Sequence, residues 1–260
     1  DAERIRLSYS LSKARYFEQA LKELEVVVNH NPRSIYAHLS IGNIYCLQRR
    51  YGEAFREFQI LTQLSPLMTE AYLNLGQICL RLVCLEEALG YFDITLNLDP
   101  KLPQAYLSRG QVLMRQTKYD EAISHFYHGL NLNSKMLLAY LLLGEVYRKQ
   151  QKFSLAMAAL KTVLDAQPKF MVAYIRLGRL YLDIKEPLKA KNSFEYALEL
   201  NAFSIYAYLG LADAFIQLNQ LEASYDIIEK LSQFNKNDFN STQSSVSGEP
   251  FDETGNLEQI

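Results

Sequence analysis

The chain has 260 residues and a formal net charge of −2, so no overall positive field would attract nucleic acid. It contains no run of 18 or more apolar residues, and we therefore expect no membrane-spanning helix. The three cysteines, Cys46, Cys79 and Cys84, lack metal-ligand spacing. This odd count favours free thiols in a reducing compartment such as the cytoplasm over a disulfide framework.

A period of 34 residues runs along the chain from Asp1 without insertion. It defines seven frames: 1–34, 35–68, 69–102, 103–136, 137–170, 171–204 and 205–238. Residues at the same place in each frame share a frame position, numbered from 1 to 34. A fixed period of this length is typical of a stack of identical supersecondary units rather than of one closed core.

Each frame predicts two helices with a short polar break between them. Apolar or small residues recur at frame positions 4, 7, 8 and 11, which lie on one side of a helix. A second stripe follows at positions 20, 24 and 27, and the frames end in helix-stopping segments such as Asn29–Pro32. Each repeat is therefore predicted to be a helical hairpin.

Small residues recur where the two helices of a hairpin would cross. A glycine in mid-helix costs about 1 kcal/mol relative to alanine, so its repetition at position 8 needs a packing reason. We expect the second helix to pass close to that glycine, and phenylalanines at position 24 to fill the space toward the next repeat. The glycines are Gly42, Gly76, Gly110, Gly144 and Gly178, and the phenylalanines are Phe58, Phe92, Phe126 and Phe194.

The period, the glycines, an alanine at position 20 and a proline at position 32 together resemble the tetratricopeptide repeat family over residues 1–238. The resemblance implies an all-α fold: a right-handed superhelical α-solenoid of about seven hairpins. It also implies that partners bind in a concave groove lined by the first helices. The end frames depart from the pattern, with Ser8 in place of glycine and Ser224 in place of alanine. Terminal repeats are expected to be atypical because one side meets solvent.

The composition changes after Asp238. Residues 239–260 are rich in Ser, Thr, Gly and Asn and contain no Lys or Arg. Such a segment cannot bury enough apolar surface to order itself, so we expect a flexible acidic tail behind the array. Because Asp1 falls within a repeat, we also expect the chain to be part of a longer protein.

No catalytic constellation stands out in the sequence. It contains no glycine-rich phosphate loop, no G-x-S-x-G motif and no zinc-type spacing of cysteine and histidine. His125 and His128 are three residues apart on a predicted helix, but no third ligand lies nearby in sequence. We therefore expect a protein that is not an enzyme and holds no cofactor or metal.

The side of each first helix away from the packing stripe would line the groove. Position 5 is aliphatic in every frame, and position 9 is mostly polar. Position 5 could pack between neighbouring first helices while position 9 is solvated. Alternatively, an apolar floor lies beside a ladder of amides that pair with a peptide backbone. The predicted partner-binding residues are Leu39, Asn43, Leu73, Asn74, Gln77, Arg81, Leu107, Gln111, Arg115, Leu141, Glu145, Arg148, Arg176 and Arg179.

Charge on this side concentrates in the fifth and sixth frames. Arg148, Lys149, Arg176 and Arg179 fall there, with Glu145 and Asp183 alongside. Such a patch could hold acidic side chains or a C-terminal carboxylate, and a salt-bridged solvated surface is an equal alternative. The chaperone-binding subclass of the family holds a terminal carboxylate with a lysine at position 5. That clamp is absent because position 5 is aliphatic.

We therefore predict a non-catalytic scaffold that binds a peptide or helical segment of a protein partner within a multiprotein assembly. Two alternatives stay open. The chain could be the targeting domain of a larger enzyme, such as a glycosyltransferase or phosphatase. It could also form a homo-oligomer through its end repeats.

Overall fold

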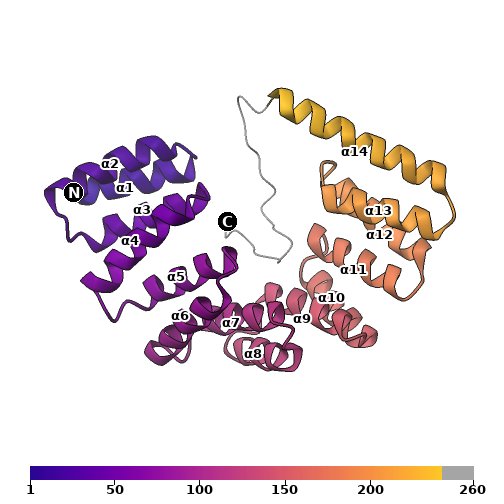
Figure 1. Ribbon diagram of the computed structural model, residues 1–260, viewed down its shortest axis with the longest axis horizontal. Coiled ribbons are helices and arrows are strands. Elements are labelled where there is room, and N and C mark those ends of the chain that lie inside the picture. The colour runs from indigo at the N-terminus through magenta and orange to yellow at the C-terminus, as the bar shows by residue number, and fades with distance from the viewer. Residues whose placement is uncertain (242–260) are drawn as a thin grey trace. The chain divides into compact units, whose positions relative to one another are not determined.

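The computed structural model describes residues 1–241, with side chains only through Ser232. These residues form fourteen α-helices and no strand, which confirms the predicted all-α fold (Figure 1). The helices are α1 (Ala2–Lys13), α2 (Phe17–His30), α3 (Ile35–Leu47), α4 (Tyr51–Leu64), α5 (Thr69–Arg81), α6 (Leu85–Leu98), α7 (Pro103–Arg115), α8 (Tyr119–Leu132), α9 (Leu137–Lys149), α10 (Phe153–Ala166), α11 (Met171–Asp183), α12 (Pro187–Leu200), α13 (Ile205–Gln217) and α14 (Leu221–Ser241).

The helices follow the frames of the sequence. Every first helix from α3 to α13 begins at the first residue of a frame. The last helix, α14, continues three residues beyond 238, and residues 242–260 of the expected acidic tail lie outside the described residues. The right-handed superhelix of the array stays a prediction.

The chain divides between Lys118 and Tyr119 into two compact units, which hold α1–α7 and α8–α14. Within each unit, consecutive helices pack as hairpins. First helices of neighbouring repeats also touch: α1 with α3 and α5 with α7 in one unit, α9 with α11 and α11 with α13 in the other. No comparable contact joins second helices in the described part of the chain. Repeats of one unit are therefore closer together on their first-helix side.

Successive repeats are joined by small apolar clusters with a common register. In one cluster, Ala20, Leu24 and Val27 of α2 share a buried core with Ala37, Ile41 and Ile44 of α3. Each residue of the second helix is matched by the residue 17 places later in the chain. The same register joins α4 to α5 through Ala54, Phe58, Leu61, Ala71, Leu75 and Ile78, and α12 to α13 through Ala190, Phe194, Ala197, Ala207, Leu211 and Ala214.

The glycines stand where the helices of a hairpin come closest, as the sequence predicts. A Cβ atom added to Gly76 would lie 2.5 Å from Cε1 of Phe92, which is closer than real Cβ contacts. Phe194 lies against Gly178 of its own repeat and also against Gly210 of the next. The phenylalanine at position 24 therefore fills the hairpin crossing and the space toward the following repeat together.

The turn inside each hairpin has a conformation that the sequence did not indicate. The residue at position 15 is left-handed in all seven repeats, with φ between 58° and 63°, and none of these residues is glycine. The next amide donates to a carbonyl five residues back, as from Cys84 to Cys79 at 2.8 Å. This combination is a Schellman motif, which ends the first helix by satisfying its last carbonyls.

Candidate functional site

The predicted binding residues lie on the side of the first helices that carries frame positions 5, 6, 9, 12 and 13, here called the first-helix face. In the first unit, Asn43 of α3 is exposed, while Asn74 and Gln77 of α5 are half-buried. Within the described residues, none of these three amides has a hydrogen-bond partner. Leu39 and Leu73 are half-buried on the same two helices.

The burial of the aliphatic residue at position 5 differs between repeats. Leu39 packs partly against the cluster of α4 and α5, and Leu73 against the cluster that holds Phe92. Leu107 and Leu141 are buried. Gln111 at position 9 is buried as well and engaged in interactions of its own. The free amides of the described face are thus Asn43, Asn74 and Gln77, and Leu107 and Leu141 are part of the packing.

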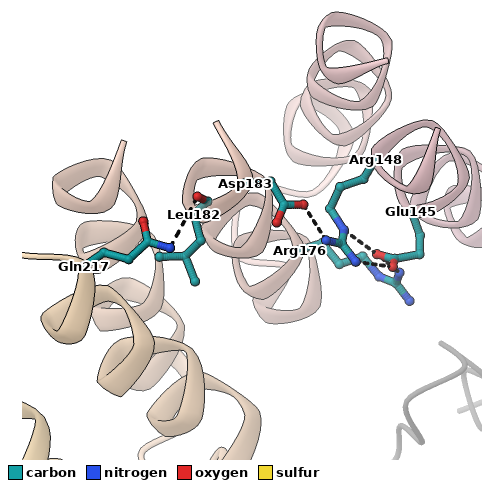
Figure 2. Close-up of polar contacts among 6 residues, drawn as sticks. All are labelled: Glu145, Arg148, Arg176, Leu182, Asp183 and Gln217. Atoms are coloured by element: carbon teal, nitrogen blue, oxygen red, sulfur yellow. Dashed lines mark hydrogen bonds and ion pairs between the residues drawn. The ribbon is translucent and has the colours of Figure 1, made fainter. Parts of the chain in front are cut away.

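The predicted arginines at position 13 contact the preceding repeat. Arg115 Nη1 donates to the carbonyl oxygen of Leu80 at 2.9 Å, near the C-terminus of α5. In the last repeat, Gln217 Nε2 makes the equivalent but longer bond to Leu182, at 3.5 Å (Figure 2). Carbonyls in the last turn of a helix lack partners within the helix, so these side chains cap the neighbouring first helix. Arg81 instead lies over the ring of Tyr51, 5.9 Å from its centroid.

Four charged residues of α9 and α11 form a connected series of ion pairs, shown in Figure 2 and here called the ionic network. Arg148 Nη2 lies 2.7 Å from Glu145 Oε1, and Arg148 Nη1 lies 2.5 Å from Asp183 Oδ2. Arg176 Nη1 lies 3.3 Å from Glu145 Oε2. The two positive and two negative charges balance, and the network joins the fifth repeat to the sixth.

Burial and neighbouring charge act in opposite directions within this network. Burial alone would raise the pKa of Glu145, but the hydrogen bond from Arg148 and the charge of Arg176 outweigh it, so the pKa is lowered. Burial lowers the pKa of Arg176, against the stabilising charge of Glu145. The Nε atom of Arg176 is buried without a hydrogen-bond partner. Of the two interpretations of this patch, the structure resembles the salt-bridged one, although Arg176 is buried rather than solvated.

Two basic side chains beside the network remain accessible. Arg179 is half-buried, and its guanidinium lies over the ring of Tyr206 on α13, 5.8 Å from the centroid. Arg179 makes no ion pair with any described residue. Lys149, at the end of α9, is exposed. These two residues, and not Arg148 or Arg176, present positive charge that a partner could reach.

Polar bridges between repeats recur at positions that the sequence reasoning missed. A glutamine at position 14 donates to an acid at position 18 of the preceding repeat, in three cases: Gln48 to Glu18 at 3.1 Å, Gln116 to Glu86 at 2.9 Å and Gln150 to Asp120 at 3.0 Å. Where the bridge is missing, both members differ, as with Leu82 and Gly52. This correlated change at positions 14 and 18 is the sequence signal that could have predicted the bridges.

The aromatic residue at position 4 makes a second recurring bond. The hydroxyls of Tyr106 and Tyr174 donate to the carbonyls of Pro100 and Pro168, at 3.1 and 2.9 Å. In the second repeat this place is taken by buried His38, whose Nε2 lies 3.0 Å from the carbonyl of Pro32, and whose Nδ1 lies 2.6 Å from Glu57 Oε2. These bonds fix the loops between repeats.

The described helices include none with the length and apolar character that crossing a membrane would need. The side chains described through Ser232 bring together no group of three or more His, Cys, Asp or Glu that could hold a metal ion.

Comparison with solved structures identifies several of similar fold. A tetratricopeptide repeat protein from Parabacteroides merdae is 16% identical with a TM-score of 0.75, over 89% of this chain and 92% of that one. A chain of the APC/C hetero-tetramer Cut9–Hcn1 is 19% identical with a TM-score of 0.73, over 81% of this chain and 42% of that one. The protein pilF of Pseudomonas aeruginosa is 17% identical with a TM-score of 0.67, over 82% and 96%. At these identities the likeness concerns the fold.

No curated protein sequence matches the chain. Three family models described as tetratricopeptide repeat match residues 48–103, 113–177 and 172–203. Together they cover more than half of the sequence, and they fall on the helical hairpins of both units. The chain belongs to the tetratricopeptide repeat family.

Proposed function

We propose that the chain is a non-catalytic scaffold that binds a peptide or helical segment of a partner protein on the first-helix face. The observation that carries the proposal is the set of unpaired amides Asn43, Asn74 and Gln77 on α3 and α5. An amide both donates and accepts, so it can pair with peptide N–H and C=O groups whatever the side chains of the segment.

The half-buried leucines beside these amides supply the apolar part of the contact. Leu39 and Leu73 keep part of their surface open to solvent. Covering apolar surface stabilises a complex by about 25 cal/mol per Å², while polar contacts mainly fix orientation. A segment that lays apolar side chains on Leu39 and Leu73, with its backbone toward the amides, satisfies both kinds of group.

In the second unit, acidic groups of a partner would meet Arg179 and Lys149. Arg148 and Arg176 are committed to Glu145 and Asp183, so they hold α9 and α11 together instead. A protein partner also agrees with the solved Cut9–Hcn1 structure of similar fold, which is described as a hetero-tetramer. For this chain, membership of an assembly is part of the proposal.

The test compares two triple variants of the full chain in affinity capture followed by mass spectrometry. One carries Asn43→Ala, Asn74→Ala and Gln77→Ala. The control carries Gln59→Ala, Gln63→Ala and Asn97→Ala, which remove three exposed amides from the second helices α4 and α6. A partner retained by wild type and control but lost by the first variant supports the proposal.

Titration of the captured partner by calorimetry then gives the affinity. We expect it to be at least tenfold weaker for the first variant than for the control. Equal capture and equal affinity for both variants would remove the first-helix face from the function.

A further inference from the structure

The second helix of each internal repeat gives an apolar stripe to the repeat that follows. The stripe includes frame position 24, whose side chain is fully buried in Leu24, Phe58, Phe92 and Phe194. It packs on a first helix with small or apolar residues at positions 3, 7 and 10, as Phe194 does with Ala207, Leu211 and Ala214. The same interface joins α2 to α3 and α4 to α5.

On α14 an apolar surface that includes position 24 of this stripe, and positions 17 and 21 beside it, is uncovered. Leu221, Tyr225 and Ile228 are spaced i, i+4 and i+7, which places them on one side of the helix. Their exposed fractions are 64%, 71% and 50%. The side of α14 toward α13, next to these residues, is packed: Ser224 is buried and its hydroxyl donates to the carbonyl of Ala212 at 3.1 Å, and Ile227 lies against the cluster of α12 and α13. Figure 1 shows α14 at the end of the second unit, with α13 as its neighbour.

The residues that would fall in register after α14 lack the large apolar side chains of most internal first helices. In the α2–α3, α4–α5 and α12–α13 interfaces, each stripe residue is matched 17 places later by an apolar or small residue. The residues 17 places after Ser224, Ile228 and Leu231 are Ser241, Ser245 and Gly248. That trio has no aliphatic side chain, so this register offers no large apolar match to Ile228.

Acidic residues border the stripe on one side. With 3.6 residues per turn, Glu222, Asp226 and Glu229 follow the stripe around the helix on the edge away from α13. All three are exposed. In the described side chains of α14, Lys230 is the one basic residue, and it falls farther around the helix. A complementary surface therefore needs an apolar centre with positive charge on one border.

We propose that the stripe of Leu221, Tyr225 and Ile228 docks a basic amphipathic helix of a partner protein. That helix would carry small or apolar residues at i, i+4 and i+7, with Lys or Arg along one border. It would cover Ile228 at position 24, which internal second helices bury against the next first helix, together with the neighbouring positions 17 and 21. The surface is separate from the first-helix face, so this inference stands or falls independently of the proposed function.

The chain itself supplies two matched probes. The peptide of α11, Met171–Asp183, has Ala173, Leu177 and Leu180 in the required register and a net charge of +1. The peptide of α13, Ile205–Gln217, has the same register and a net charge of −1. Peptides of this length are poorly helical in water, so both carry a side-chain staple away from the register residues.

Fluorescence anisotropy with the full chain measures the binding of each probe. We expect the α11 peptide to bind at least tenfold more tightly than the α13 peptide at low salt, and the difference to shrink as salt screens the acidic border. The double variant Tyr225→Ser/Ile228→Ser should weaken α11 binding at least tenfold. Because both side chains are half exposed or more, its circular dichroism should match wild type. Leu188→Ser, at an exposed leucine of α12, is the control and should leave binding unchanged.

Four results would overturn the inference. The first is equal affinity for the two peptides at low salt. The second is binding that the double variant does not weaken. The third is concentration-dependent dimerisation that the double variant abolishes, because a second copy would then cover the stripe. The fourth is a tenfold gain in affinity on removal of residues 242–260, because the chain would then cover its own stripe.

Discussion

Arg176 of α11 and Glu145 of α9 lie 3.3 Å apart, from Nη1 to Oε2, and join two successive repeats through buried charge. Arg176 has 7% of its surface exposed, and Glu145 also holds Arg148. The contact makes Arg176 part of the packing between first helices. Arg179, three residues later, points to Tyr206 and has no acidic partner among the described residues.

Arg176 should contribute more than Arg179 to the stability of the fold. Removing Arg176 leaves two carboxylates with one arginine in a buried network, so Arg176→Ala should lower the free energy of unfolding by about 1–3 kcal/mol. Arg179→Ala removes a partly exposed cation–π contact and should cost less than about 1 kcal/mol. Chemical denaturation of both variants measures the difference. Equal destabilisation would show that Arg176 is not held as the structure indicates.

The contrast between these arginines also shows which features can be predicted from the sequence. The period of 34 residues predicts the hairpins, the glycine crossings and the residues that share the first-helix face, because these depend on spacing along one helix. Burial on that face depends instead on how closely the neighbouring first helices approach. Arg176 at position 6 and Leu141 at position 5 are covered in this way, while Asn43 at position 9 is not. The 34-residue pattern does not predict the distance between neighbouring first helices.

The turn residues give a second example of this limit. A left-handed residue is usually signalled by glycine, and position 15 holds residues as different as Arg49 and Val83. The hydrogen bonds of the Schellman motif impose the conformation whatever the side chain. The sequence therefore predicted a break between the helices but not its geometry.

The ionic network predicts a specific dependence of stability on pH. The pKa of Glu145 is lowered in the folded protein, so its carboxylate stabilises the fold above the unfolded pKa of about 4.3. That contribution is lost as the pH falls through the folded pKa. Glu145→Gln should therefore destabilise the protein at pH 7, and the difference from wild type should shrink below about pH 4.

Urea denaturation at a series of pH values measures this difference. Glu199→Gln, at an exposed carboxylate of α12, is the matched control and should behave like wild type throughout. A difference between wild type and Glu145→Gln that stays constant down to pH 3 would contradict the assignment of the charge to Glu145.

Two glycines on neighbouring helices should respond to alanine with opposite sign. At Gly76 the added Cβ would lie 2.5 Å from the ring of Phe92. Such overpacking should lower the free energy of unfolding of Gly76→Ala by about 1–3 kcal/mol. Gly90, in α6, has nothing within 4 Å of an added Cβ, so alanine should stabilise the protein by up to about 1 kcal/mol through helix propensity.

Thermal unfolding of Gly76→Ala and Gly90→Ala measures both effects on one protein. Gly76→Ala should destabilise the Phe92→Leu variant less than it destabilises wild type, because the shorter side chain makes room for the methyl group. Additive effects of the two substitutions would mean that the ring of Phe92 is not the obstacle.

Val83 is the turn residue whose replacement should stabilise the protein most clearly. It is β-branched, 63% exposed and left-handed at φ 63°, a conformation that costs an L-residue about 1–2 kcal/mol. Glycine removes this cost but adds backbone entropy to the unfolded chain, so Val83→Gly should raise the free energy of unfolding by about 1 kcal/mol. Asn219→Gly, at the equivalent place in the last repeat, should gain less because asparagine tolerates left-handed backbone. Chemical denaturation ranks the two variants, and a loss of stability in Val83→Gly would mean that the valine side chain makes a stabilising contact that outweighs its backbone strain.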